Sequence, residues 1–205
     1  PVAPYLELAR HMAALEGQPV LFPNLAGFPG WRAVSGVCAR RGHFAAALGC
    51  TVSEVTRRMA DALAAPEYPT VVGAGPCQDV VEPRVDLVSL PIPQYHPLDG
   101  GRYVTSAIMV INDPDYGRNV AFHRLMVLDE RRLAVRLVEG RGTHTAFGKT
   151  QADMPVAIAV GCPLQALLAA AMSPAKGVDE FAIAHALAPL ELVPCQTVPL
   201  QVPAQ

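Results

Sequence analysis

The segment DYGRNVAFHRLMVLD, Asp115–Asp129, lies in the middle of a chain of 205 residues. Its apolar and aromatic residues predict a β-strand. Three polar side chains interrupt the apolar run: Asn119, His123 and Arg124. In an ideal strand Asn119 and His123 face one side and Arg124 faces the other. Asn119 and Arg124 can serve one site only if the strand bends or if one of them lies at its end. The alternative is that Asn119 closes a turn and Arg124 is solvent-exposed.

Alternating apolar residues continue on both sides of this segment. They predict antiparallel strands in series from Tyr103 to Val138, with a turn at Pro114–Gly117. The glycine-rich stretch 140–154, which contains His144, is expected to be a loop. The remaining elements predicted towards the C-terminus are a strand in PVAIAVG (155–161), helices in CPLQALLAAAM (162–172) and DEFAIAHALAP (179–189), and an extended pair in LELVPCQTVPLQVP (190–203).

The first hundred residues mix helical and extended patterns. Helical spacing of apolar residues over Pro4–Glu16 predicts a helix, and Gly49–Ala65 predicts a second one. Thr51 followed by Glu54 has the spacing of a capping box at the start of that second helix. The extended candidates are QPVLFPNL (18–25), WRAVSGVCA (31–39), TVVGAGPCQDVV (70–81) and VDLVSLPIP (85–93). The sequence therefore predicts a small α/β domain over residues 1–100 and a mainly β domain over residues 101–205.

Composition narrows the function classes. The formal net charge of −2 gives no general attraction to nucleic acid or to an anionic membrane. The apolar runs are too short to cross a bilayer, and the first residues do not have the pattern of a signal peptide. Five scattered cysteines without a CxxC pair argue against a zinc site or a disulfide framework. We therefore expect a cytoplasmic protein that has reduced thiols and binds neither nucleic acid nor membrane.

Two groups of polar residues are candidate binding sites on their chemistry alone. Arg136, Arg141 and Gly142 could hold a phosphate through guanidinium groups and close backbone N–H groups, or could form an exposed loop. Glu180, after Asp179, could cap a helix, or could join Asn119 in an oxygen-rich site for Mg²⁺ or Mn²⁺. No residue beside the histidines supplies a paired nucleophile.

Three stretches in this order resemble the UbiD family of prenylated-FMN-dependent decarboxylases, which remove or add CO₂ on aromatic and α,β-unsaturated acids. They are DGGRYVTSAIMVINDPDYGRNVAFHRLMV (99–127), MPVAIAVGCPLQALLAAAM (154–172) and GVDEFAIAHALAPLELVPCQTVPLQVPA (177–204). The stretch PCQDVVEPRVDLVSLPIP (76–93) is similar to the family's lead-in to its central domain. The resemblance implies a small α/β unit followed by a split β-barrel that binds prenylated FMN, and a carboxy-lyase activity.

The resemblance also implies roles for individual residues. Asn119 and Glu180 bind a divalent metal, Mn²⁺ or Mg²⁺, which contacts the flavin phosphate. Arg124 is the catalytic residue: it lies over the flavin ring and pairs with the substrate carboxylate. The other residues expected to contact the cofactor are Phe122, His123, Arg136, Leu137, Val138, Arg141 and Gly142. A K⁺ ion is expected on the carbonyl groups of Ala169, Ala170 and Met172. The offset of His144 does not match that of a third metal ligand found in some members.

The chain departs from the family in length, since its members are usually much longer. Their proton-donating acid follows the stretch that ends here, so we expect a partial chain that lacks the C-terminal domain and is inactive alone. The expected partners are a small carboxylic acid and further UbiD-like chains, in a homo-oligomer or hetero-oligomer. Two alternatives are a non-catalytic subunit of a multi-subunit carboxylase and a flavin-binding module without decarboxylase activity. The length of the natural polypeptide distinguishes them from the enzyme.

Overall fold

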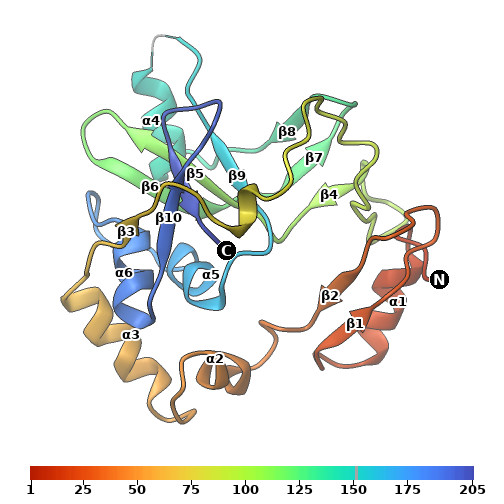
Figure 1. The fold of residues 1–205 in the computed structure, drawn as a ribbon, viewed down its shortest axis with the longest axis horizontal. Helices are drawn as coiled ribbons and strands as arrows, with labels where there is room; N and C mark the ends of the chain where they lie inside the picture. The colour runs from red at the N-terminus through yellow and green to blue at the C-terminus, as the bar shows by residue number, and fades with distance from the viewer. Residues whose placement is uncertain (151) are drawn as a thin grey trace. The chain divides into compact units, whose positions relative to one another are not determined.

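A computed structural model describes residues 1–150 and 152–205. These residues form two compact units whose segments interleave along the sequence (Figure 1). Unit 1 comprises Pro1–Phe44, Glu82–Thr105 and Arg124–Val135, and unit 2 comprises Ala45–Val81, Ser106–His123 and Arg136–Gln205. The division into domains at residues 1–100 and 101–205 stays a prediction.

Unit 1 contains one helix and two small sheets. Helix α1 (Glu7–Ala14) precedes the antiparallel pair β1 (Val20–Phe22) and β2 (Ala33–Ser35), as the sequence predicts. Helix α1 and this strand pair share a small core that consists of Leu8, Phe22 and Leu25. The second sheet has the order β4-β7-β8, with β4 at Tyr103–Val104, β7 at Leu125–Val127 and β8 at Leu133–Val135.

Unit 2 contains most of the helices and two sheets of three strands. One sheet has the order β6-β5-β9, formed by β5 (Ile108–Asp113), β6 (Gly117–Phe122) and β9 (Ala157–Ala159). The other has the order β11-β10-β3. The elements not yet named are α2 (Arg41–Ala47, which crosses the boundary between the units), α3 (Val55–Ala64), β3 (Thr70–Val71), a 3₁₀ turn at Pro76–Gln78, α4 (Gly142–Lys149), α5 (Leu164–Ala170), α6 (Glu180–Leu187), β10 (Glu191–Pro194) and β11 (Gln201–Pro203).

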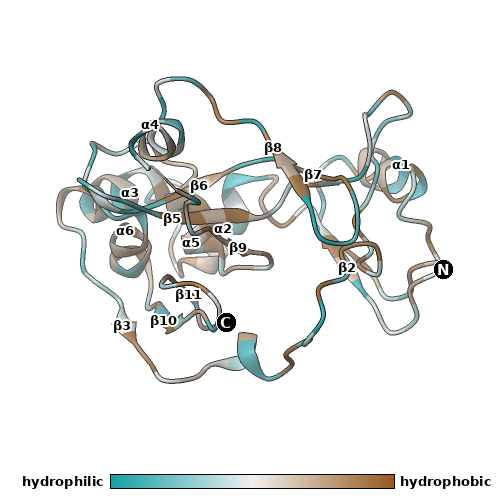
Figure 2. Ribbon diagram, turned by 90° about the horizontal axis from the view of Figure 1, so that it is seen from above, coloured by the Kyte–Doolittle hydropathy of each residue, from teal (hydrophilic) through white to brown (hydrophobic). Residues whose placement is uncertain are grey.

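The main core of unit 2 lies between the β6-β5-β9 sheet and helices α5 and α6. Residues Ile108–Ile111 of β5 are all buried, and β5 is strongly apolar in Figure 2. A continuous apolar run of this kind suits a strand that is covered on both faces. Helix α6 is equally apolar, since Phe181–Ala184 are all buried, and it lies beside α5 in Figure 1. The start of α6 is therefore packed in this core, in contact with β6.

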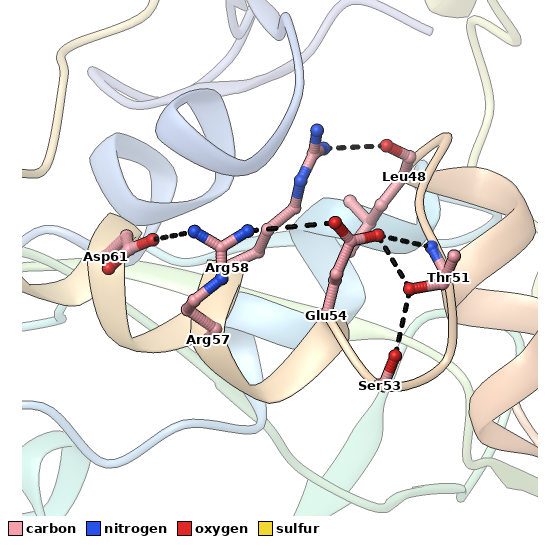
Figure 3. Close-up of polar contacts among 7 residues, drawn as sticks. All are labelled: Leu48, Thr51, Ser53, Glu54, Arg57, Arg58 and Asp61. Atoms are coloured by element: carbon pink, nitrogen blue, oxygen red, sulfur yellow. Dashed lines mark hydrogen bonds and ion pairs between the residues drawn. The ribbon is translucent and has the colours of Figure 1, made fainter.

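The start of α3 has the predicted capping contact. The Glu54 carboxylate accepts hydrogen bonds from the backbone N–H and the hydroxyl of Thr51, at 2.8 and 2.7 Å (Figure 3). Arg58, one turn into the helix, donates to the carbonyl of Leu48 at 2.8 Å. These contacts fix the chain between α2 and α3.

The predicted series of strands is partly correct. Strands β5 and β6 pair antiparallel around the predicted turn, and residues 120–128, all described, contain no helix. The expectation of one continuous strand through Arg124 is wrong, because the backbone leaves the strand conformation at His123 and Arg124. Strand β6 pairs with β5, whereas β7 pairs with β4 and β8. The two polar residues thus lie at a change of sheet.

Two further expectations are wrong. Residues 142–149 form helix α4 instead of a loop. Its glycines and threonines have low helix propensity, but Ala146 is fully buried against Met109 and Ile111, and this packing stabilises the helix. Residues 85–93, all described, form no strand. The Asp86 carboxylate accepts the N–H groups of Val88 and Ser89 in a turn, and Pro91 and Pro93 have no N–H for strand pairing.

The described residues thus form a mixed α/β structure with four small sheets and no closed barrel. Within this part of the chain, no helix combines the length and apolar character needed to span a membrane.

Candidate functional site

The candidate site forms where the start of α6 meets β6. The amide nitrogen Nδ2 of Asn119 donates to Oε1 of Glu180 at 3.1 Å, although the two residues are 61 positions apart. The backbone N–H of Val120 donates to Oε2 of the same carboxylate at 2.9 Å. Glu180 is only 3% exposed. The structure therefore brings together the two residues predicted to share a metal ion, while metal binding itself stays a prediction.

The local sequence explains why Glu180 lies at the start of a helix. Asp179 is the N-cap residue, and its carboxylate accepts the backbone N–H of Phe181 at 2.9 Å. A carboxylate in this position is favoured by the partial positive charge at a helix N-terminus. The capping role predicted for this acidic pair is thus correct for Asp179, and Glu180 points to β6.

Burial dominates the electrostatics of these carboxyl groups. It raises the pKa of Glu180 to about 7, against the smaller opposing effects of the hydrogen bonds from Val120 and Asn119. Burial also raises the pKa of Asp179, in spite of the neighbouring Arg118 guanidinium. A cation beside Glu180 would offset the cost of burying its negative charge. No group of three or more His, Cys, Asp or Glu residues that could hold a metal occurs in the described part of the chain.

The start of α4 lies against Asn119. A Cβ atom at Gly142 would lie 3.1 Å from Oδ1 of Asn119, so glycine permits this close approach. One residue further on, Oγ1 of Thr143 lies 3.0 Å from Nε2 of His123. Burial lowers the pKa of His123, and a hydrogen bond to the backbone of Arg136 only partly opposes this. His123 therefore connects the end of β6 to the start of α4 through its imidazole ring.

The remaining residues predicted to contact the cofactor lie in more exposed surroundings. Phe122 and Val138 are 40% and 54% exposed, and Arg136 and Arg141 are exposed too. Leu137 packs on a small cluster that contains Ala146 of α4. These five residues stay predictions as cofactor contacts.

Three further expectations also stay predictions. Arg124 follows His123 directly and is exposed, but it belongs to unit 1, so its catalytic role is not tested by the contacts within unit 2. Of the carbonyl groups expected to bind K⁺, that of Ala169 accepts the N–H of Met172 at 3.0 Å. His144 is half-buried on α4.

Sequence reasoning missed one pair of residues beside the site. Nη1 of Arg118 lies 2.9 Å from Oδ2 of Asp179, and both side chains are largely buried. Arg118 immediately precedes Asn119, just as Asp179 precedes Glu180. Because each of these oppositely charged residues directly precedes one member of the pair Asn119 and Glu180, the sequence indicated that Arg118 and Asp179 could form an ion pair.

Comparison with known proteins identifies the family. Residues 70–205 match the UbiD model, described as 3-octaprenyl-4-hydroxybenzoate carboxy-lyase Rift-related domain, and residues 1–63 match the N-terminal domain of the same carboxy-lyase. The chain belongs to the UbiD family. The resemblance found in the sequence is thereby confirmed.

Two UbiD relatives are anhydromevalonate phosphate decarboxylases. The protein of Methanothermobacter thermautotrophicus is 37% identical over 177 residues, which is 83% of this chain and 41% of the relative. The protein of Methanosarcina mazei is 31% identical over 95% of this chain and 46% of its own length. The chain thus spans less than half the length of these relatives.

Solved structures of UbiD enzymes have the same fold. HmfF from Pelotomaculum thermopropionicum, solved in complex with FMN, matches with a TM-score of 0.93 and 36% identity, over 99% of this chain and 48% of HmfF. The apo 3,4-dihydroxybenzoic acid decarboxylase AroY of Klebsiella pneumoniae matches with a TM-score of 0.86 and 28% identity, over 100% of this chain and 48% of AroY.

Proposed function

We propose that the protein is a UbiD-class decarboxylase that uses prenylated FMN and a divalent cation. The observation that supports this best is the contact between Asn119 and Glu180 across 61 positions of sequence. Family membership and the solved complexes of HmfF with FMN and with prenylated FMN support the flavin.

The residues present fit a hard divalent cation. Asn119 and Glu180 offer amide and carboxylate oxygens, which are ligands that Mn²⁺ and Mg²⁺ accept. Glu180 is a buried carboxylate whose hydrogen bonds come from an amide and a backbone N–H and not from a cationic group. A metal would supply the missing positive charge, and two protein ligands leave coordination positions for water or a phosphate.

The same surroundings fit the phosphate of a flavin. The first N–H groups of α4, from Gly142, lie beside Asn119, and helix N-termini favour anions. Arg141 precedes them and can donate to phosphate oxygens. A K⁺ ion on the carbonyl groups near Ala169 is part of the same proposal.

Each group of residues then has a task. When bound, prenylated FMN supplies the ring that takes up the electron pair left by departing CO₂. Asn119 and Glu180 would hold the cation, and Phe122 and Val138, whose apolar side chains are exposed, would contact the flavin. Arg124 binds the substrate carboxylate with its planar guanidinium and orients it for bond cleavage. The split β-barrel predicted from the sequence is also part of this proposal.

The substrate is a small carboxylic acid, aromatic or α,β-unsaturated. One relative is named for anhydromevalonate phosphate and a structural neighbour for 3,4-dihydroxybenzoic acid, so the family accepts chemically different acids. We further propose an oligomer, since an evolved form of HmfF is dimeric.

The test is reconstitution of the complete natural polypeptide with prenylated FMN and Mn²⁺, followed by measurement of CO₂ release from a panel of aromatic, acrylic and phosphorylated unsaturated acids. Turnover of at least one acid is expected, with a loss of about a hundredfold or more in Arg124→Met, since its charged hydrogen bonds align the substrate. A protein that binds flavin and metal tightly but releases CO₂ from no acid would be a flavin-binding module or a non-catalytic subunit.

A further inference from the structure

Arg118 is a charged residue of unit 2 that the proposed function leaves without a role. It lies in β6 directly before Asn119, and its side chain is 20% exposed. Nη1 of its guanidinium donates to Oδ2 of Asp179 at 2.9 Å. Nη2 donates to the side-chain carbonyl of Gln201, at the start of β11. Its Cζ atom lies 5.5 Å from the centre of the Phe181 ring, within the range of a cation–π contact.

These contacts commit Arg118 to other protein groups. Its guanidinium connects three elements, namely β6, the first residues of α6, and β11. A residue held this way is poorly placed to reach out to a phosphate or a substrate. Its effect on the site must therefore pass through the residues it holds.

The sheet geometry explains how two consecutive residues of β6 both reach α6. Consecutive side chains of a strand point to opposite faces. Among the described strands, β6 pairs only with β5, so no strand is paired with its other edge. The N–H of Val120 donates from that edge to Glu180, so the start of α6 lies along the edge. Side chains from either face can then reach it: Arg118 meets Asp179, and Asn119 meets Glu180.

We propose that Arg118 is a positioning residue: by pairing with Asp179 it fixes the start of α6 along the edge of β6, and so holds the Glu180 carboxylate on Asn119. The inference deepens the proposed function, on which it rests for the role of Glu180 as a cation ligand. It assigns the geometry of the cation site to a residue that contacts neither metal nor flavin.

The amide of Val120 offers a direct measure of this positioning that needs no ligand. Its N–H donates to Glu180, so its hydrogen exchange reports whether the carboxylate is in place. The test measures exchange at Val120 by mass spectrometry with residue-level fragmentation. In Arg118→Gln the Val120 amide should exchange at least tenfold faster than in the wild-type protein. The amide of Val110 on the neighbouring strand should change less than twofold.

Arg58 provides the matched control. It is also a partly buried arginine of unit 2. It donates to the carbonyl of Leu48 at 2.8 Å (Figure 3), so this hydrogen bond connects α3 to the segment after α2 and not to β6. Arg58→Met should leave exchange at Val120 within twofold of the wild-type rate. A similar acceleration in both variants would show that Arg118 supports the fold in general, and would overturn the proposal.

Asp179→Asn keeps the inference testable if Arg118→Gln does not fold. An asparagine can still cap Phe181, since Asn is a good N-cap residue, but it no longer carries the charge that pairs with Arg118. Exchange at Val120 should again accelerate about tenfold. Adding Arg118→Gln to this variant should change it less than twofold further, because Arg118 acts through Asp179. An unchanged rate at Val120 in the folded Asp179→Asn protein would overturn the proposal.

FMN binding in the presence of Mn²⁺ is measured by the quenching of flavin fluorescence. This measurement tests the proposed function separately from the positioning role of Arg118. Arg118→Gln should raise the Kd about tenfold and Arg58→Met less than twofold. If the wild-type protein binds neither FMN nor Mn²⁺ but Val120 still responds to Arg118→Gln, the proposed function fails and the positioning role stands. If the wild-type protein binds both and Val120 does not respond, the positioning role fails alone.

Discussion

Replacing Glu180 with glutamine should reveal what the buried carboxylate costs the fold when no cation is present. Burial raises its pKa from about 4.5 to about 7. One pKa unit corresponds to about 1.4 kcal/mol, so the charged form costs on the order of 3 kcal/mol. A glutamine keeps an oxygen that can accept the N–H of Val120 but cannot ionise. The variant should therefore lack this cost.

The direction in which the unfolding free energy changes with pH follows from the number of protons that each state binds. Between pH 4.5 and 7 folded Glu180 keeps its proton while the unfolded chain has released it. The folded state then binds more protons, so the free energy of unfolding falls as the pH rises through this window. Above pH 7 the full cost is present. The difference in unfolding free energy between Glu180→Gln and the wild-type protein should thus shift by about 3 kcal/mol in favour of the variant between pH 4.5 and 8.

The assay is urea unfolding of both proteins in EDTA at several pH values from 4.5 to 8. Other titrating groups are shared by the two proteins and cancel in the difference. Glu191→Gln, at an exposed position of β10, is the control and should show no such trend. Addition of Mn²⁺ at pH 7.5 should stabilise the wild-type protein and not Glu180→Gln. A difference that stays flat with pH would refute the argument, because the carboxyl group would then ionise as easily in the folded state as in water.

Three further results are expected. Gly142→Ala should weaken FMN binding about tenfold, because the new methyl group would lie 3.1 Å from Asn119. The control is Gly148→Ala in the same helix, where the methyl group meets open space; it should stabilise the protein by about 0.5–1 kcal/mol in urea unfolding. Lys149→Met should lower the Tm, because Asp113 is 4% exposed and loses its 2.8 Å ion pair with Lys149. The pKa of Asp113 is lowered in the folded protein, so the stabilisation by this ion pair should disappear as the pH falls below about 4. A polypeptide of these 205 residues alone should release no CO₂ when supplied with prenylated FMN and Mn²⁺, and turnover equal to that of a longer relative would contradict this.

Local sequence patterns predicted correctly those elements for which residue type and apolar spacing indicate the same structure. The turn at Pro114–Gly117 combines proline, aspartate and glycine between apolar strands, and the structure has it where predicted. Helix α6 follows from its apolar sequence and its acidic start. Helix α4 was missed because Gly142 and Gly148 have low intrinsic helix propensity, while the packing that stabilises the helix comes from β5, more than thirty residues earlier.

The site was less accessible to local reasoning. Their oxygen chemistry left a shared cation site of Asn119 and Glu180 open as one alternative. Only the resemblance to a family favoured it over helix capping, since no local rule links residues 61 positions apart. The break at His123 depends on which strands β7 finds as partners, and this is decided outside the segment itself. Arg118 was overlooked because an arginine in a strand is ordinarily exposed to solvent.

The contact between Glu180 and the N–H of Val120 has a consequence for solubility. A free strand edge is a template on which another chain can add a strand, and proteins commonly block such edges. Here the carboxylate that we propose to bind the cation also accepts an N–H group on the edge of β6 that pairs with no described strand. Replacing Glu180 with alanine would remove the proposed metal ligand and also leave the Val120 N–H on this edge open to neighbouring molecules. A chain with such a replacement risks aggregating before its activity can be assayed, so only replacements that still accept the Val120 N–H can report on catalysis.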